Sequence, residues 1–319
     1  MNEIGGYFGL ELNRGLEYHK NAIKLNTGRN AFEYILRANR YKKVYIPYYT
    51  CDTILQPINT LSIKYEFYSI DESLEVIFDF RKVRKDEVLL YTNYFGLKDR
   101  YVLELSKKCK NLIIDNSQAF FAKPLKDIDT FYSARKYFGV SDGAYLYTNK
   151  NVSLGARLDS SLMRIEHLVR RIENSATDGY RYFLKNENAL NNLPILRMSK
   201  LSQNILTSID YKAVSKKRKM NYNLFHRELK GMNLIDFPLD KRQTPMVYPF
   251  LTTDNKLREK LAENMIFTPQ YWPNVLSWTD KTSLEYFYST KLIHLPIDQR
   301  YSPADLFRVI RLIKHEYKR

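Results

Sequence analysis

The sequence predicts an α/β protein with two domains. A large domain is expected around a mixed, mostly parallel sheet, and a small α+β domain is expected at the C-terminal end. In the first half of the chain, short apolar runs alternate with stretches of helical spacing, which is typical of a parallel sheet with helices on its faces. The chain has 319 residues, 44% of them hydrophobic, which is enough for one large and one smaller domain.

Four apolar runs in the first half predict buried strands. They cover residues 44–46, 88–91, 112–114 and 144–147, and each is nearly free of polar residues. A short continuous apolar run is typical of a strand that is buried on both faces. Between these runs, residues 31–38 and 101–108 have apolar positions three and four apart, which predicts helices.

The second half of the chain predicts mostly helices. From about residue 154 to 229, apolar positions recur at helical spacing, as in Leu162, Ile165, Leu168 and Val169. The last stretch, 303–317, is amphipathic. Because no Pro-, Gly- or Ser-rich linker occurs, we expect the boundary inside a continuous element, with a large domain over 1–215 and a small one over 216–319.

Neither a membrane segment nor a metal site is expected. No apolar run approaches the roughly 20 residues that a membrane-spanning helix needs, and residues 1–9 lack the layout of a signal peptide. We therefore predict a cytoplasmic protein. Two cysteines, Cys51 and Cys109, are too few for a disulfide framework or a cysteine-based zinc site, and the histidines have no ligand spacing.

The net charge of +16 is unusual. It is compatible with nucleic acid, an anionic membrane surface or a phosphorylated small substrate as partner. The densest basic run, 216–219, lies in a predicted helix and is expected to be a solvated face. Because no basic motif interleaved with aromatic residues surrounds this run, we expect no nucleic-acid partner.

A first candidate site residue follows the apolar run 112–114. Asp115 comes directly after this predicted strand, at the end where open α/β sheets bind ligands. An Asp at a strand end can also simply cap the next turn. A buried carboxylate needs a cationic or hydrogen-bonding partner, and a protonated pyridine nitrogen would be one.

A second candidate, Lys136, lies in a loop with aromatic neighbours and a turn at 139–143. Poorly hydrated surroundings lower the pKa of a lysine and favour the neutral amine, which can attack an aldehyde. An exposed surface lysine is the plain alternative, since the chain holds 51 Lys and Arg.

A third candidate opens the predicted helix at 31–38. The preceding run 27–30 contains Gly28, and a glycine at a helix N-terminus frees backbone N–H groups to hold a phosphate. An ordinary Thr or Asn helix cap is the alternative. The order along the chain is therefore a phosphate site, a strand-end Asp with Gln118 three residues later, and a lysine.

These motifs together carry a resemblance. Asp115-x-x-Gln118, Ser133-x-x-Lys136 and the turn that follows resemble the DegT/StrS-type sugar aminotransferase family, a branch of the aspartate-aminotransferase fold (fold type I). Further motifs match in the same order and extend the likeness over nearly the whole chain; they lie at residues 27–31, 47–50, 93–96, 197–199 and 295–296.

The resemblance implies a pyridoxal 5'-phosphate (PLP) site. Lys136 would hold the cofactor as a Schiff base, Asp115 would pair with its pyridine nitrogen, and Gln118 would lie beside its ring hydroxyl. Asp115 would keep that nitrogen protonated, and Lys136 would move a proton between the substrate and the cofactor. Four further residues would hold the phosphate: Gly28, Arg29 and Asn30 through backbone N–H groups, and Ser133 through its hydroxyl.

The chain departs from the family pattern at three places. Cys51 stands where the family has an aromatic residue that stacks on the cofactor, so stacking is expected from Tyr48, Tyr49 or Tyr94, or it is weaker. Ile195 stands where the family has an Asn that reaches the partner subunit's phosphate. Two nearby residues could substitute for it: Asn191 and Asn192. At a third place, Asn93 replaces the usual His.

The resemblance further implies an aminotransferase that works as a homodimer. Its expected amino donor is glutamate, and its expected acceptor is a nucleotide-linked keto-sugar of surface-polysaccharide or related amino-sugar biosynthesis. Because a diphosphate carries about two negative charges, a few basic side chains would suffice to bind it, and Arg197 and Arg29 are candidates. Two alternatives stay open. One is a PLP enzyme of the same fold that acts on a non-sugar keto substrate. The other is a non-catalytic, basic regulatory or nucleic-acid-binding derivative. Dehydratases of the family carry His in place of the lysine, so Lys136 argues against that branch.

Overall fold

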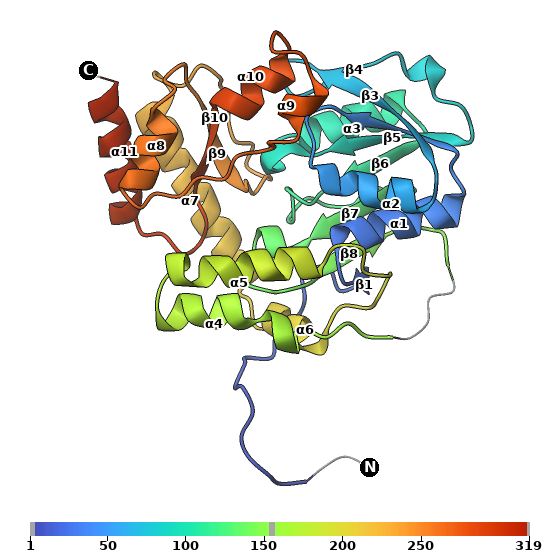
Figure 1. Ribbon diagram of the computed structural model, residues 1–319, viewed down its shortest axis with the longest axis horizontal. Helices are drawn as coiled ribbons and strands as arrows, with labels where there is room; N and C mark the ends of the chain where they lie inside the picture. The colour runs from blue at the N-terminus through green and yellow to red at the C-terminus, as the bar shows by residue number, and fades with distance from the viewer. Residues whose placement is uncertain (1–3, 153–156, 318–319) are drawn as a thin grey trace.

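A mixed eight-stranded sheet forms the centre of the protein (Figure 1). The computed structural model describes residues 4–152 and 157–317. The strand order is β1-β8-β7-β6-β5-β2-β3-β4; β3, β2, β5, β6 and β7 run parallel, and β1, β8 and β4 pair antiparallel. The predicted mixed, mostly parallel sheet is confirmed. The strands are β1 (Ile23–Leu25), β2 (Lys43–Pro47), β3 (Lys64–Ile70), β4 (Val76–Ile77), β5 (Glu87–Thr92), β6 (Leu112–Asp115), β7 (Asp129–Ser133) and β8 (Ala144–Tyr147).

Helices cover both faces of this sheet. In β5, Val88 and Leu90 pack into one core together with α1 (Gly28–Asn39) and α2 (Leu55–Thr60). Leu89 and Tyr91 pack into the other core, with α3 (Asp99–Lys108). Side chains alternate between the faces with a period of two, so a strand covered on both sides is apolar at every position.

The four predicted strands are confirmed as β2, β5, β6 and β8, while β1, β3, β4 and β7 were not predicted as strands. β3 carries Lys64 and Glu66 on a surface that is largely exposed, because only the short β4 lies beyond it. β1 has only three residues. β1, β3 and β4 lie at or near an edge and lack the apolar run that marks buried strands. β7 lies inside the sheet, and its apolar run is short because Asp129, Thr130 and Ser133 interrupt it.

Helices follow β8, as predicted. They are α4 (Glu166–Glu173), α5 (Ala176–Ala189), α6 (Lys200–Thr207) and α7 (Tyr211–Leu229), and α4 and α5 lie side by side (Figure 1). Residues 153–156, where the predicted helical region begins, lie outside the described residues. Short 3-10 turns occur between the elements: η1 (Asp52–Ile54), η2 (Phe80–Lys82), η3 (Tyr94–Gly96), η4 (Ala134–Lys136) and η5 (Leu162–Arg164).

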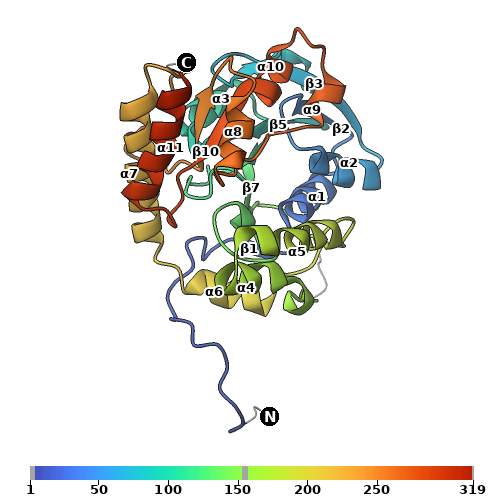
Figure 2. The same cartoon turned by 60° about the vertical axis from the view of Figure 1, so that its left-hand side comes forward.

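The C-terminal part has a two-stranded antiparallel sheet of β9 (Val247–Leu251) and β10 (Leu292–Pro296). Its helices are α8 (Leu257–Glu263), α9 (Val275–Trp278), α10 (Leu284–Lys291) and α11 (Pro303–Glu316). Helix α11 confirms the amphipathic prediction and packs along α7 (Figure 2). It starts with a capping box between Ser302 and Asp305. Residue 215 lies inside α7, and the division into domains at that point stays a prediction.

The loop after β5 ties the large sheet to the C-terminal part. Gly96 has a φ of +69°, and a Cβ there would lie 2.8 Å from the Thr244 carbonyl oxygen, so the close approach requires glycine. The Met246 N–H donates to the Phe95 carbonyl oxygen at 2.8 Å. None of the helices in 4–152 and 157–317 is both long and apolar enough to span a membrane.

Candidate active site

Asp115 is the last residue of β6 and is buried, with 9% of its surface exposed. One carboxylate oxygen accepts a 2.7 Å hydrogen bond from the Ser117 N–H. Burial raises the pKa of this carboxyl, and the Ser117 N–H and the Lys136 ammonium oppose the rise. The strand end therefore holds a poorly solvated carboxylate that a further cation would stabilise.

Gln118 lies one turn after Asp115 and is 2% exposed. Its Oε1 accepts from the Phe95 N–H at 3.0 Å. Its Nε2 is buried and has no hydrogen-bond partner among the described residues. Because a buried amide donor without a partner is costly, this nitrogen marks a place where an acceptor from a ligand would fit.

Lys136 ends the 3-10 turn η4, which follows β7. Its side chain can be reached by solvent, yet protein groups surround it closely enough that desolvation lowers the pKa of its amine. Among the neighbouring charges, Arg135 adds to this lowering, while Cys51 and Asp115 oppose it. A lysine that is both accessible and poorly hydrated is suited to act as a nucleophile.

The structure brings Asp115 and Lys136 together, since each shifts the pKa of the other. The Tyr137 hydroxyl, next in the chain after Lys136, donates to the Gln118 carbonyl oxygen at 2.8 Å. The Tyr137 carbonyl oxygen in turn accepts from Gln299 Nε2 at 3.0 Å. The lysine turn is thus fixed to the Asp115–Gln118 turn and to the C-terminal part of the chain.

The N-terminus of α1 lies beside these turns. A Cβ at Gly28 would lie 3.4 Å from the Ser117 hydroxyl. The Thr27 hydroxyl caps the helix by accepting a hydrogen bond from the Asn30 N–H at 3.2 Å. The Asn30 N–H is therefore paired, and the preceding N–H groups of the first turn are available to a ligand. Ser133, at the end of β7, is buried, and its hydroxyl makes no hydrogen bond to another described residue.

The Arg29 side chain forms hydrogen bonds with other side chains of its own chain. Its Nη1 donates to Gln56 Oε1 at 2.8 Å and to Asn191 Oδ1 at 2.6 Å. Asn191 is thus in contact with Arg29, and Asn192 donates its N–H to Gln56 Oε1 at 3.4 Å. Whether either reaches the phosphate of a partner subunit stays a prediction. Arg197 is exposed, and Ile195 packs against the core that contains α1.

Arg135 is a site neighbour that sequence reasoning missed. Burial lowers its pKa to about 10, and the nearby charge of Arg29 contributes. Its guanidinium contacts the Glu187 carboxylate. Two arginines within electrostatic range of each other, beside the N-terminus of α1, favour an anion at this place.

The three tyrosines considered for ring stacking lie elsewhere. Tyr49 and Tyr94 are both 0% exposed; the Tyr49 ring packs against Trp272 at 5.0 Å, and the Tyr94 hydroxyl donates to the Tyr49 carbonyl oxygen. Tyr48 stacks on Phe67, with ring centroids 4.6 Å apart. Because Tyr49 and Tyr94 expose no surface, neither ring lines the accessible space around Lys136, and this burial argues against a stacking role for them.

Tyr271 is the aromatic residue beside Lys136, and sequence reasoning missed it. The lysine Nζ lies 5.4 Å from the centroid of its ring. Cys51 is half-buried and close enough to affect the pKa of Lys136, Arg29 and Tyr271. No sequence signal links position 271 to a lysine so far away in the chain, because the C-terminal part folds back over the sheet.

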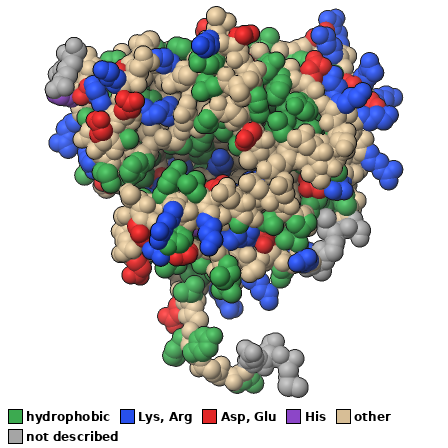
Figure 3. All heavy atoms as spheres, viewed as in Figure 1, with side chains coloured by type: hydrophobic (Ala, Val, Ile, Leu, Met, Phe, Trp, Pro, Cys, Tyr) green, Lys and Arg blue, Asp and Glu red, His purple; other side chains and the backbone are tan. Residues whose placement is uncertain are grey.

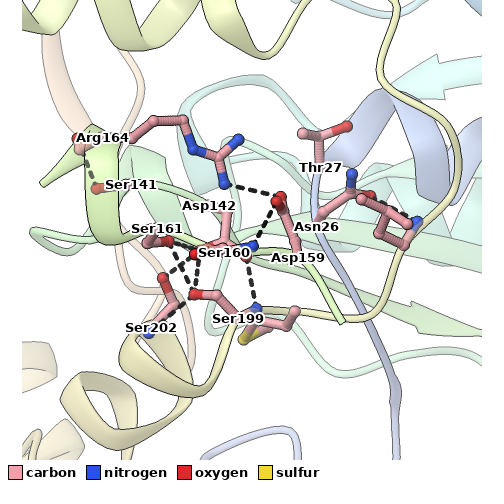
Figure 4. Close-up of polar contacts among 12 residues, drawn as sticks. Asn26, Thr27, Ser141, Asp142, Asp159, Ser160, Ser161, Arg164, Ser199 and Ser202 are labelled. Carbon is pink, nitrogen blue, oxygen red and sulfur yellow. Dashed lines mark hydrogen bonds and ion pairs between the residues drawn. The ribbon is translucent and has the colours of Figure 1, made fainter. Parts of the chain in front are cut away.

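The buried carboxylate of Asp142, six residues after Lys136, accepts hydrogen bonds from several serines (Figure 4). Asp142 is 0% exposed and accepts hydrogen bonds from the hydroxyls of Ser161 (2.5 Å), Ser199 (2.6 Å) and Ser202, and from the Ser199 N–H (2.8 Å). The next residue, Gly143, donates its N–H to the Asn26 carbonyl oxygen at 2.6 Å. The network therefore links the turn at 139–143, which follows Lys136, to the start of α1.

The surface of the protein is hollowed near the middle of one face, with basic atoms inside the hollow (Figure 3).

Two open depressions lie away from Lys136, along β3. One is lined by Lys43, Lys64, Tyr65, Glu66 and Arg84, and the other by Tyr48, Phe67, Ser69, Phe78 and Lys82. Both border the exposed edge of the sheet and contain none of the groups around Asp115.

No protein-family model matches the chain, and no curated protein sequence matches it. Solved structures do match. A DegT DnrJ EryC1 StrS aminotransferase from Brucella abortus superposes with a TM-score of 0.65 at 14% identity, over 93% of this chain and 86% of that one. The sugar aminotransferase CalS13 from Micromonospora echinospora gives 0.60 at 13% identity, over 93% and 88%.

Two further neighbours agree. The aminotransferase TlmJ from Streptoalloteichus hindustanus superposes with a TM-score of 0.63 at 12% identity, over 92% of this chain and 85% of that one. Spr1654 from Streptococcus pneumoniae has been solved in a PLP form and a PMP form, with TM-scores of 0.63 and 0.64. At identities this low, the superpositions establish the fold and nothing finer. The chain has the fold-type-I architecture of the DegT/StrS aminotransferases.

Proposed function

We propose that the protein is a PLP-dependent aminotransferase. The observation that supports this most is the meeting of three groups at one edge of the sheet: the buried Asp115, the unpaired Nε2 of Gln118, and Lys136 with its lowered pKa. Each of the three is unfavourable alone, and PLP would satisfy all of them. Perturbed groups of this kind gather at functional sites.

The residues present fit the cofactor. Lys136 Nζ would form the covalent link, and the Asp115 carboxylate would pair with the ring nitrogen. Gln118 Nε2 would donate to the ring hydroxyl and would thereby gain the hydrogen-bond partner that it lacks among the described residues. Free N–H groups of the first turn of α1 would hold the phosphate, with Ser133 and the charges of Arg29 and Arg135 nearby.

The cofactor, when bound, supplies a conjugated ring that accepts the electrons of a broken Cα–H bond. Asp115 keeps a proton on the ring nitrogen, because an ionised carboxylate beside it favours the charged form. Lys136 Nζ would take the proton from the donor's Cα and deliver it to C4' of the cofactor, and in the second half of the reaction it would move a proton in the opposite direction. Its lowered pKa makes the neutral, proton-accepting amine more abundant near neutral pH.

We further infer glutamate as the donor and a nucleotide-linked keto-sugar as the acceptor, in surface-polysaccharide or related amino-sugar biosynthesis. The neighbours whose names specify a sugar aminotransferase support a sugar. A homodimer in the cytoplasm completes the proposal. Large apolar side chains exposed around α4 and α5 would suit a subunit interface; they include Met163, Ile172 and Tyr180.

An absorbance spectrum tests this function. The purified protein with added PLP should show a band of protein-bound cofactor that changes to the PMP spectrum when glutamate is added and returns when an acceptor is supplied. A panel of nucleotide-linked keto-sugars and non-sugar keto acids as acceptors separates the sugar enzyme from its relative with another substrate. A protein that binds no PLP contradicts the proposed function.

A further inference from the structure

We propose that Tyr271 is a positioning residue for Lys136 and supplies the aromatic wall of the cofactor site that position 51 lacks. The inference rests on the proposed function and adds a residue from the C-terminal part of the chain to it.

The position of Tyr271 is the first support. It lies between α8 and α9, and its half-buried ring faces the Lys136 amine at 5.4 Å from Nζ to the ring centroid. The ring is fixed from behind by His294, at a centroid distance of 4.4 Å, and by Phe95, at 6.5 Å and 21° between planes. A ring held in this way can orient a flexible lysine side chain.

The space in front of Tyr271 is the second support. Phe95 donates its N–H to Gln118 Oε1, so the ring's neighbour is bonded to the amide whose Nε2 is unpaired. Cys51 affects the pKa of both Tyr271 and Lys136. Lys136 thus faces Tyr271 directly, Gln118 is joined to Tyr271 through Phe95, and Cys51 lies within electrostatic range of both Lys136 and Tyr271.

The chemistry of Cys51 and Tyr271 is the third support. A thiol offers a cofactor ring little stacking area, whereas an aromatic ring packs against another with a favourable energy. Burial raises the pKa of the Tyr271 hydroxyl, so the phenol stays neutral and adds no charge beside the amine. No hydrogen bond joins that hydroxyl to another described residue, which leaves it available to a ligand.

The test compares Tyr271→Leu, Tyr271→Phe, Cys51→Tyr and the double variant Cys51→Tyr/Tyr271→Leu. Tyr48→Leu serves as control, since Tyr48 stacks on Phe67 and lines a depression along β3 that contains none of Asp115, Gln118 and Lys136. The readouts are the PLP dissociation constant and the fraction of protein labelled at Lys136 after borohydride reduction, with circular dichroism to verify folding.

Tyr271→Leu should weaken PLP binding about tenfold, the size expected for losing one aromatic contact. Tyr271→Phe should keep most of the affinity, and Tyr48→Leu should leave it unchanged. Cys51→Tyr should restore binding in the double variant, because the ring is then supplied from the other side of the same space.

Wild-type affinity in folded Tyr271→Leu, or a double variant no better than Tyr271→Leu, would overturn the inference while the proposed function stands. If the Tyr271→Leu chain fails to fold, two variants that keep a ring at position 271 decide: Tyr271→Phe must bind PLP with nearly wild-type affinity, and Cys51→Tyr alone must bind it more tightly than wild type. Failure of either result overturns the inference. A wild-type protein that binds no PLP overturns the proposed function and this inference with it.

Discussion

At the scale of single residues, the candidate site is assembled from groups that burial makes less stable. The carboxyl of Asp115 has a raised pKa and the amine of Lys136 a lowered one, and desolvation is the main cause in both. Buried charges are costly unless a partner offsets them. Such groups lower the stability of the folded protein without cofactor. Binding of the cofactor would restore that stability, because it supplies the missing partners.

Asp115→Asn should therefore stabilise the protein without cofactor. A carboxyl whose folded pKa is raised keeps its proton to higher pH in the folded state than in the unfolded chain, so folding stability falls as pH rises through that interval. Asn removes this loss and can still accept from the Ser117 N–H. We expect a higher melting temperature than wild type at pH 7 and a smaller difference as pH approaches 4.

Thermal unfolding with and without PLP checks this prediction. PLP should raise the melting temperature of wild type more than that of Asp115→Asn, because the variant has lost the carboxylate that pairs with the ring nitrogen. A variant that is less stable than wild type at pH 7, or that gains as much from PLP, would contradict it.

At the scale of elements, Asp142 holds together three segments: the turn after Lys136, the loop at 161 and the start of α6. Ser199, one of its donors, is also the N-cap of α6. A single carboxylate thus accepts from three hydroxyls and one N–H. Such a buried network is strong only while it is complete.

Asp142→Asn should lower the free energy of unfolding by ~2–4 kcal/mol, because the amide places an NH2 group against hydrogen-bond donors inside the core. Chemical denaturation measures this loss. Asp86→Asn is the matched control, since Asp86 forms a surface ion pair with Lys42 and its loss should leave the free energy of unfolding nearly unchanged. Equal effects of the two substitutions would show that the network adds nothing to stability.

The strands with continuous apolar runs could be predicted from the sequence, whereas the edge strands and the buried β7, which contains Asp129, Thr130 and Ser133, could not. Strands β5 and β6 show as continuous apolar runs because both faces are covered, whereas β3 lies near an edge and carries charges.

In the site, Asp115 ends a strand that its apolar run predicts, and Lys136 is indicated by its aromatic neighbours and the turn that follows it. Tyr271 and Arg135 become site neighbours through tertiary contacts, and neither stands out in the local pattern.

At the scale of the whole molecule, the net charge of +16 is not explained by the candidate site alone. Much of the positive charge is on exposed side chains, and several lysines and arginines pair with carboxylates, as Arg100 does with Glu104. We expect the excess positive charge to attract a small phosphorylated acceptor to the site around Lys136 and not to bind nucleic acid.

Salt dependence separates these two uses. Nucleic-acid binding through phosphates weakens steeply with salt, because each neutralised phosphate releases a counterion, whereas a compact diphosphate site responds modestly. At physiological salt we expect the protein to bind a nucleoside diphosphate measurably. We expect no submicromolar dissociation constant for a DNA duplex or a single strand. Tight nucleic-acid binding at that salt, with no diphosphate binding, would support the regulatory alternative.

The most direct test of the account is to identify the residue that binds the cofactor covalently. The protein is incubated with PLP, reduced with borohydride, digested and examined by peptide mass spectrometry. We predict one reduced cofactor per chain, on Lys136, with Lys136→Ala unlabelled yet folded. Label on another lysine, or no label on a folded chain that has been given excess PLP, would contradict the assignment of this site.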